Sequence, residues 1–164
     1  MAYYIPNPNI FRPEEIFPPW IVDQYRDKNK NINKTIWRLT DSRLLWTAVQ
    51  LRGLFGKMTV NNYLWGGSND ERGYRDPIRL IDIKHFKQTG VIRASWSSFT
   101  SQHCFGRALD STFKNYLVKD IIKYIMTNNE RNEFKYIMAI EKETRWFHFD
   151  IRNFKIANQR FFIF

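Results

Sequence analysis

Two short stretches of the chain contain residue types that bind metal ions. The first, residues 101–110, reads Ser-Gln-His-Cys-Phe-Gly-Arg-Ala-Leu-Asp and places His103 seven residues before Asp110. The second, residues 146–150, reads Trp-Phe-His-Phe-Asp and contains His148. Two imidazoles and one carboxylate form a three-ligand site for a divalent ion with an open fourth position, the pattern of a catalytic zinc site. A structural zinc normally has four protein ligands, often thiolates, and the chain has one cysteine.

The order of these residues resembles a known family. Ser-x-His-x-x-Gly-x-Ala-x-Asp, followed by Trp-x-His-x-Asp, is similar to the motifs of the zinc D-alanyl-D-alanine carboxypeptidase family, which includes VanX-type dipeptidases and phage L-alanyl-D-glutamate endolysins. The resemblance covers residues 40–152 approximately. It implies that His103, Asp110 and His148 bind one Zn²⁺ ion and that Ser101 forms a hydrogen bond with the substrate.

A third match lies upstream. The stretches Trp-Gly-Gly at residues 65–67 and Glu-Arg-Gly-Tyr-Arg at residues 71–75 resemble the family's Gly-Tyr-Arg stretch, whose arginine binds substrate. The resemblance implies that Arg75 anchors a substrate carboxylate, because a guanidinium can bind both carboxylate oxygens at once. The spacing alone favours a simpler interpretation, in which Arg72 and Arg75 are two solvent-exposed arginines.

The catalytic base is where the chain departs from the family. The family often has a glutamate three residues before its second histidine, and this chain has Arg145 there. We predict a β-hairpin from residues 134–140 and 146–151, because both are rich in β-branched and aromatic residues. A turn centred between residues 143 and 144 pairs Ala139 with His148 and places Glu141 on the face of His148.

Glu141 is therefore the predicted base, with Glu143 as the alternative. A three-residue turn would move Glu141 to the opposite face, where it would be an ordinary surface glutamate. Asp150 follows His148 by two residues and shares its face, so we predict that it orients a ligand or a substrate amine. A local structural hydrogen bond explains Asp150, and likewise Ser101, about equally well.

The resemblance implies a zinc peptidase that hydrolyses the peptide stems of bacterial peptidoglycan, either as a carboxypeptidase or as an endolysin-type endopeptidase of phage origin. The alternative is a catalytically inactive metal-binding member of the same fold, serving as a virion structural or cell-wall-binding protein; Arg145 favours this alternative. A third hypothesis is nucleic-acid binding, since 26 basic and 16 acidic residues give a net charge of +10. The basic residues are scattered, which argues against nucleic acid as the partner and leaves wall polymers and other virion proteins.

The N-terminus lacks the basic and apolar segments of a signal peptide, and no apolar run is long enough to span a membrane. We therefore expect synthesis in the cytoplasm of a bacterial host and action at the wall after lysis or from a virion. Cys104 adjoins His103, but a Cys–His nucleophile needs a base oriented toward the thiol. A small, buried, unreactive cysteine is the favoured interpretation of Cys104.

The elements that must position these residues are predicted from periodicity. Residues 1–34, rich in proline and aromatics, are expected to form an extended arm with one turn near residues 13–15, and residues 35–164 a single peptidase-like domain. Helices are expected at residues 40–55 and 112–126, the second capped by Asp110 or Ser111. The expected strands are 57–64, 134–140, 146–151 and 154–164, with a long functional loop at 65–100. This order predicts an α+β fold, an antiparallel sheet with helices on one face.

Overall fold

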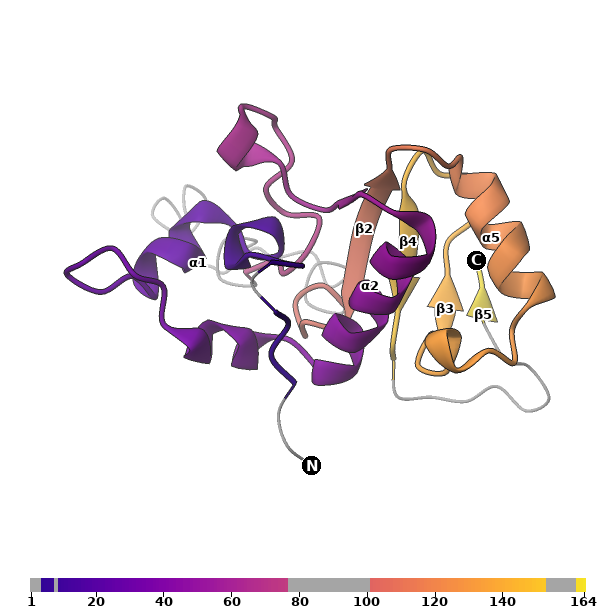
Figure 1. Ribbon diagram of the computed structural model, residues 1–164, viewed down its shortest axis with the longest axis horizontal. Helices are drawn as coiled ribbons and strands as arrows, with labels where there is room; N and C mark the ends of the chain where they lie inside the picture. The colour runs from indigo at the N-terminus through magenta and orange to yellow at the C-terminus, as the bar shows by residue number, and fades with distance from the viewer. Residues whose placement is uncertain (1–3, 8, 77–100, 153–161) are drawn as a thin grey trace, which may run out of the picture.

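A five-stranded sheet lies at the centre of the computed structural model, which describes residues 4–7, 9–76, 101–152 and 162–164 (Figure 1). The strand order is β1-β2-β4-β3-β5. The strands are β1 Met58–Thr59, β2 Ala108–Phe113, β3 Ala139–Ile140, β4 Phe147–Asp150 and β5 Phe162–Ile163. All pairings are antiparallel except that of β5 with β3, which is parallel. The predicted α+β class is confirmed, although the sheet is mostly, not entirely, antiparallel.

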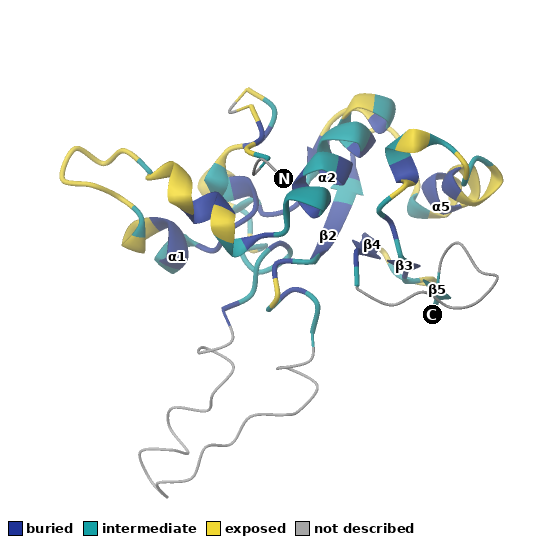
Figure 2. Ribbon diagram, turned by 90° about the horizontal axis from the view of Figure 1, so that it is seen from below, coloured by how far each residue is buried: buried dark blue, intermediate teal, exposed yellow. Residues whose placement is uncertain are grey.

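Two long helices, α2 Ser42–Phe55 and α5 Val118–Thr127, lie on the same side of the strands (Figure 2). The carboxylate of Asp41 accepts a hydrogen bond from the backbone N–H of Arg43 and so caps α2, which ends at Gly56 with a φ of 76°. This confirms the helix predicted for residues 40–55. Among the described residues, no helix has the length and apolar character needed to cross a membrane.

The second predicted helix begins later than expected. Asp110 and Ser111 are not its cap but lie within β2, and α5 begins at Val118 after Leu117. Asp and Ser are common caps, yet here the chain from Ala108 to Ser111 pairs with β4 and is buried, so strand pairing outweighs the local preference.

Among the described residues of 1–34, where an arm was predicted, two short segments are helical rather than extended. They are the predicted turn, which is the 3₁₀ helix η1 Pro13–Glu15, and the helix α1 Pro19–Gln24. Pro13 and Pro19 each occupy the first position of their helix, where the backbone N–H has no intrahelical acceptor and its absence therefore costs nothing. The side chains of Phe11, Ile16 and Phe17 are fully buried in the same core as α2, and each gains roughly 2 kcal/mol from burial.

Three predicted strands are shorter in the structure, of which 146–151 is reduced only to β4 Phe147–Asp150. Only Met58–Thr59 of residues 57–64 is a strand, and the 3₁₀ helix η3 Tyr63–Trp65 follows. Residues 134–140 contribute only β3, and Phe134 belongs instead to the 3₁₀ helix η5 Asn132–Phe134. The remaining described 3₁₀ helix is η2 Lys34–Leu39. Much of the loop predicted at residues 65–100, and the start of the strand predicted at 154–164, lie outside the described residues.

The two faces of the sheet have different roles. Leu109 of β2, Ile140 of β3 and Phe149 of β4 belong to the buried core beneath the helices. Side chains alternate along a strand, so Asp110 and His148 lie on the opposite face. The functional residues are therefore on the sheet face that the helices leave uncovered.

Candidate metal centre

His103, Asp110 and His148 come together in one buried cluster, and their ligand atoms all lie within 4.8 Å of one another. Asp110 in β2 is directly opposite His148 in β4. The N–H of Asp110 donates to the carbonyl of Arg72, whereas the carbonyl of His148 accepts from Glu141, so the two residues form a non-hydrogen-bonded pair. Side chains of such pairs are the closer ones in an antiparallel ladder. The cluster could hold a metal ion.

His103 is held in place by the backbone of the segment that packs against β2. Its Nδ1 lies 2.7 Å from the carbonyl oxygen of Gly73, and its Nε2 lies 3.4 Å from Oδ1 of Asp110. An Nδ1–H that donates to a carbonyl leaves the lone pair on Nε2, which faces the cluster. A Cβ on Gly73 would lie 2.0 Å from the carbonyl oxygen of Ile16, so glycine is needed for this close approach.

Gly106 turns the chain from His103 into β2. Its φ is 62°, in the left-handed region that favours glycine. A Cβ there would also lie 2.1 Å from the carbonyl oxygen of Leu39. Glycine is therefore required at position 106 for a structural reason: it allows the loop between His103 and β2 to lie against the end of η2.

His148 lies between two carboxylates. Its Nδ1 is 2.6 Å from Oδ1 of Asp110, and its Nε2 is 3.7 Å from Oδ2 of Asp150. Burial disfavours the charged imidazolium, but the hydrogen bond to Asp110 and the nearby carboxylate of Asp150 outweigh it and raise the pKa of His148 to about 9. Burial also opposes the charge of Asp110, yet the contacts with His103 and His148 hold the pKa of that carboxyl well below its usual range.

The residue types of the cluster are compatible with a divalent metal ion, and one ligand separation matches that of a tetrahedral site. Zinc binds imidazole nitrogen and carboxylate oxygen at about 2.0–2.2 Å, so two ligand atoms of a tetrahedron lie ~3.4 Å apart. The separation of His103 Nε2 from Asp110 Oδ1 is 3.4 Å. The 2.6 Å contact between His148 and Asp110 is that of a shared proton, which a bound metal would replace. Asp150 would then accept the remaining N–H of His148, the usual support of a metal-bound imidazole.

The cluster opens into a cleft of about 610 Å³, which we name the main cleft. The main cleft is lined by every residue predicted for the site except Glu143, the alternative base. Its lining residues are Arg75, Ser101, Gln102, His103, Asp110, Glu141, Trp146, His148, Asp150, Arg152 and Phe164. Glu143 is exposed in the turn at a φ of 61°, and Arg145 is also exposed; neither lines this cleft.

The hairpin register differs from the predicted one by two residues. Ala139 pairs with Asp150 rather than with His148, so the next residue on the same face, Glu141, lies opposite His148 itself. A shift of two residues preserves the face, because side chains alternate with a period of two. Asp110, His148 and Glu141 therefore form one row across β2, β4 and the end of β3.

Arg75 has a partner that the sequence did not indicate. Its Nη2 donates to Oδ2 of Asp110 over 3.1 Å, and its Nε donates to the carbonyl oxygen of Glu71 over 2.9 Å. The guanidinium thus holds the outer oxygen of a candidate metal ligand while it lines the cleft. Oδ1 of Asp110 is left facing the two histidines.

Arg152 was missed by the sequence analysis. Its guanidinium donates to both oxygens of the fully buried carboxylate of Asp150 and lies 5.2 Å from the ring centroid of Phe164. Phe164 is in turn 5.8 Å from the ring of His148. The strand period could have indicated Arg152, which follows His148 and Asp150 at two-residue steps. The position of Phe164 depends on the parallel pairing of β5, which has no local signal.

Cys104 lies beside the cluster but has the properties of an unreactive thiol. It is half-buried, and burial raises the pKa of its thiol, whereas an activated nucleophile has a lowered pKa.

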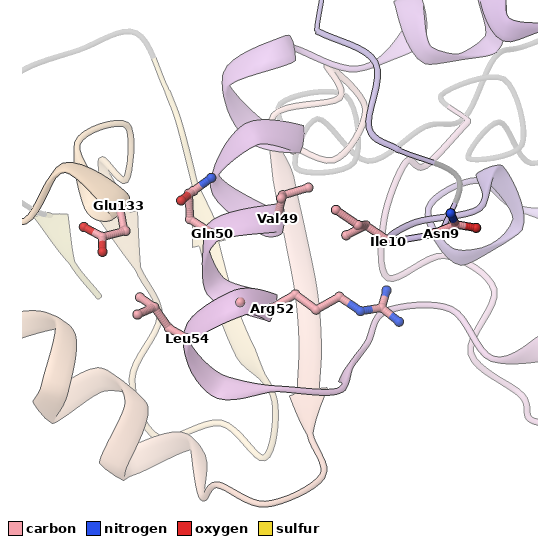
Figure 3. A pocket seen from close by; sticks show the side chains of 8 residues that line it. Asn9, Ile10, Val49, Gln50, Arg52, Leu54 and Glu133 are labelled. Carbon is pink, nitrogen blue, oxygen red and sulfur yellow. The ribbon is translucent and has the colours of Figure 1, made fainter.

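A separate cavity of about 460 Å³ lies between α2 and the N-terminal segment (Figure 3). Arg52 points toward Asn9 and Ile10, and Glu133 lies beyond the other side of α2. This cavity shares no lining residue with the main cleft.

The geometry therefore singles out the main cleft, with a histidine–aspartate–histidine cluster at its centre, as the candidate functional site. No protein-family model, curated protein or solved structure matches this chain.

Proposed function

We propose that this protein is a zinc-dependent peptidase that hydrolyses the peptide stems of bacterial peptidoglycan. One observation carries the proposal: Glu141 lies in the same cross-strand row as Asp110 and His148, on the side of the sheet that forms the main cleft. Three metal-binding side chains with a neighbouring carboxylate are the minimum set for metal-assisted hydrolysis of an amide. The sequence motifs that resemble the zinc carboxypeptidase family support the same reaction and the same class of substrate.

His103 through Nε2, Asp110 through Oδ1 and His148 through Nδ1 are the groups that would hold the ion. When bound there, zinc would polarise the scissile carbonyl and lower the pKa of water in the cleft toward ~7. Glu141 accepts the proton from the attacking water and delivers it to the leaving amine, so that one carboxylate acts first as base and then as acid. Asp150 keeps the imidazole of His148 oriented.

Arg75 and Ser101 lie on the substrate side of this arrangement. Arg75 holds Oδ2 of Asp110 in place through its Nη2 contact. Ser101 lines the main cleft beside His103 and provides a hydroxyl for a peptide carbonyl or N–H. The family resemblance supports both as substrate contacts, and it also supports a phage origin with action at the wall after lysis or from the virion.

A second candidate function is metal binding without catalysis, in a virion structural or wall-binding protein. Arg145 favours it, because the family's usual glutamate position carries an exposed guanidinium here. The two candidates differ in turnover, not in metal content.

The test is a digest of purified peptidoglycan by the zinc-loaded protein, followed by mass spectrometry, with His148→Ala as the inactive variant and Arg145→Gln as a matched control. New amine termini that require His148 and not Arg145 would establish the peptidase. Bound zinc without cleavage of several wall types would leave the non-catalytic function.

A further inference from the structure

We infer that the protein has a second ligand site, which binds a phosphate monoester whose organic part carries a ring. The site is the N-terminal pocket, which residues 9–15 form together with Arg52 and residues 57–65. Its volume of about 560 Å³ is that of a small-molecule site, and it shares no lining residue with the main cleft. It adjoins the cavity of Figure 3, because Asn9, Ile10 and Arg52 line both. Binding there is separate from the proposed peptidase function and does not depend on it.

Hydrogen bonds fix the walls of the N-terminal pocket to one another. The carbonyl oxygen of Glu15 accepts from the backbone N–H of Asn61 over 3.0 Å, which joins η1 to the segment after β1. The hydroxyl of Tyr63 donates to the carbonyl oxygen of Phe17 over 3.2 Å. Arg52 of α2 is tied to the same wall, since its Nη1 donates to Oε1 of Glu15 over 3.0 Å. The pocket is therefore built from three segments that contact one another directly.

The N-terminal pocket has a positive charge that its own carboxylate does not balance. Its charged lining residues are three cations, Arg12, Arg52 and Lys57, and one carboxylate, Glu15, so the net charge is +2. Both oxygens of Glu15 are engaged, Oε1 with Arg52 and Oε2 with the backbone N–H of Arg12 over 2.9 Å. The side chains of Arg12 and Lys57 are exposed and form no ion pair with any residue that the structure describes. These two cations are available to an anion.

The charge of the pocket indicates the class of anion. A phosphate monoester carries about −1.5 to −2 at pH 7 and has three acceptor oxygens, so it matches this pocket better than a single carboxylate does. The arginines of the main cleft are not available in the same way, because Arg75 is bonded to Asp110 and Arg152 to Asp150. An anionic ligand is therefore attracted to the N-terminal pocket through cations that no carboxylate of the protein neutralises.

Trp65 provides a surface for the organic part of the ligand. It lines the N-terminal pocket, and 61% of the residue is exposed. Its backbone is held by η3: its N–H donates to the carbonyl oxygen of Asn62 over 3.0 Å, and Gly66 follows at a φ of 79°. An exposed indole beside a positive pocket offers a flat apolar face on which a base or a sugar ring can stack. The ligand is therefore an organic phosphate rather than the free ion.

The experiment is an NMR titration of the isotope-labelled full chain, without zinc, using adenosine monophosphate as the probe. The nucleotide is expected to shift the signals of Arg12, Lys57 and the indole N–H of Trp65 in a saturable way. Inorganic phosphate and adenosine, each half of the probe, should bind at least about tenfold more weakly, the usual contribution of one charge-assisted contact or one stacked ring. No saturable shift, or equal affinity for phosphate and nucleotide, would overturn the inference.

A dinucleoside monophosphate distinguishes a free monoester from the backbone of a polymer. Its single phosphate is a diester with one negative charge, so we expect it to bind more weakly than adenosine monophosphate. Tighter binding of the diester would overturn the assignment of a monoester.

Two lysine variants distinguish the pocket from the overall basic charge. Lys57→Gln removes a positive charge from the pocket, and Lys119→Gln removes one from an exposed position in α5 outside it. Lys57→Gln is expected to raise the Kd for the nucleotide about tenfold, and Lys119→Gln to leave it within about twofold. Equal losses would mean that the nucleotide responds only to the net charge of the chain, and the site would be wrong.

The aromatic part of the site has its own matched pair. Trp65→Ala is expected to weaken nucleotide binding about tenfold and to leave the affinity for inorganic phosphate unchanged. Leu64→Ala, at a neighbouring exposed position outside the pocket, should change neither. An unchanged nucleotide Kd in Trp65→Ala would overturn the stacking role of Trp65. Because binding is measured without zinc, these results are independent of whether the protein cleaves peptidoglycan.

Discussion

Glu141 and His148 lie opposite each other on neighbouring strands, and the backbone N–H of Glu141 donates to the carbonyl oxygen of His148 over 3.4 Å. The row of Asp110, His148 and Glu141 thereby places a carboxylate one strand away from a candidate metal ligand. A backbone contact fixes this relationship, so it does not depend on the conformation of either side chain.

Replacing Glu141 by Gln should remove catalysis and leave the metal in place. The amide has the shape of the carboxylate but accepts no proton, so we expect kcat to fall by about 10²–10⁴-fold, the usual contribution of general acid–base catalysis. The zinc content of the protein, measured by inductively coupled plasma mass spectrometry, should be unchanged. Glu143→Gln is the matched control; if it were the variant that lost activity, the base would be Glu143 and the assignment of Glu141 would be wrong.

Replacing Asp150 by Asn should weaken zinc binding by about 10- to 100-fold, the typical effect of losing the carboxylate that supports a metal-bound histidine. Asp150 is fully buried and lies 3.7 Å from Nε2 of His148, so the amide loses the charge that favours this orientation. Competition with a chromophoric chelator measures the affinity. Asp120→Asn, at an exposed position in α5, should change nothing; equal affinities in all three proteins would show that Asp150 only anchors Arg152.

The metal-free protein should lose stability as the pH rises from about 6.5 to about 9. The pKa of His148 is raised from an ordinary value of 6.5 to about 9, so its imidazolium stabilises the folded state fully below pH 6.5, and this contribution is lost as pH passes through the folded pKa. A shift of this size corresponds to on the order of 3 kcal/mol, or roughly 5–10 °C in Tm. Thermal unfolding of the chelator-treated protein over this pH range measures the effect.

With zinc the trend should reverse, because the ion must displace the proton from His148. The zinc-dependent increase in Tm should grow with pH up to about 9, and zinc affinity should rise by up to about tenfold per pH unit below that value. His148→Ala should abolish both trends. A metal-free Tm that is flat with pH in the wild-type protein would mean that His148 is neutral in the apo form.

Replacing Gly73 by Ala should reduce both stability and zinc affinity. The added Cβ would lie 2.0 Å from the carbonyl oxygen of Ile16, and the resulting backbone shift would move the carbonyl that orients His103. Overpacking of this kind costs about 1–3 kcal/mol, so we expect Tm to fall by roughly 3–10 °C. Gly53→Ala is the control: its Cβ meets nothing within 4 Å in the last turn of α2, and it should stabilise the helix by up to about 1 kcal/mol.

The sequence by itself determined which residues form the candidate metal cluster and which face of the hairpin they share. The order of the motifs predicts His103, Asp110 and His148. The alternation of side chains along a strand predicts the face of Glu141, and a register shift by an even number of residues does not change that face. Helix α2 could also be predicted, because its apolar spacing, its Asp41 cap and the Gly56 end all act locally. Such features need no information about distant parts of the chain.

Only the tertiary structure decided how the cluster is supported and where the substrate can lie. Asp110 has the local signature of a helix cap, but its pairing with His148 places it in a strand, since cross-strand burial outweighs a single capping bond. The N-terminal segment packs against Gly73 and Tyr74 and into the core, because burying Phe11, Ile16 and Phe17 requires a surface formed by residues far along the chain. The contact of Arg75 with Asp110 and the parallel pairing of β5 with β3 likewise join distant segments, and local periodicity does not predict them.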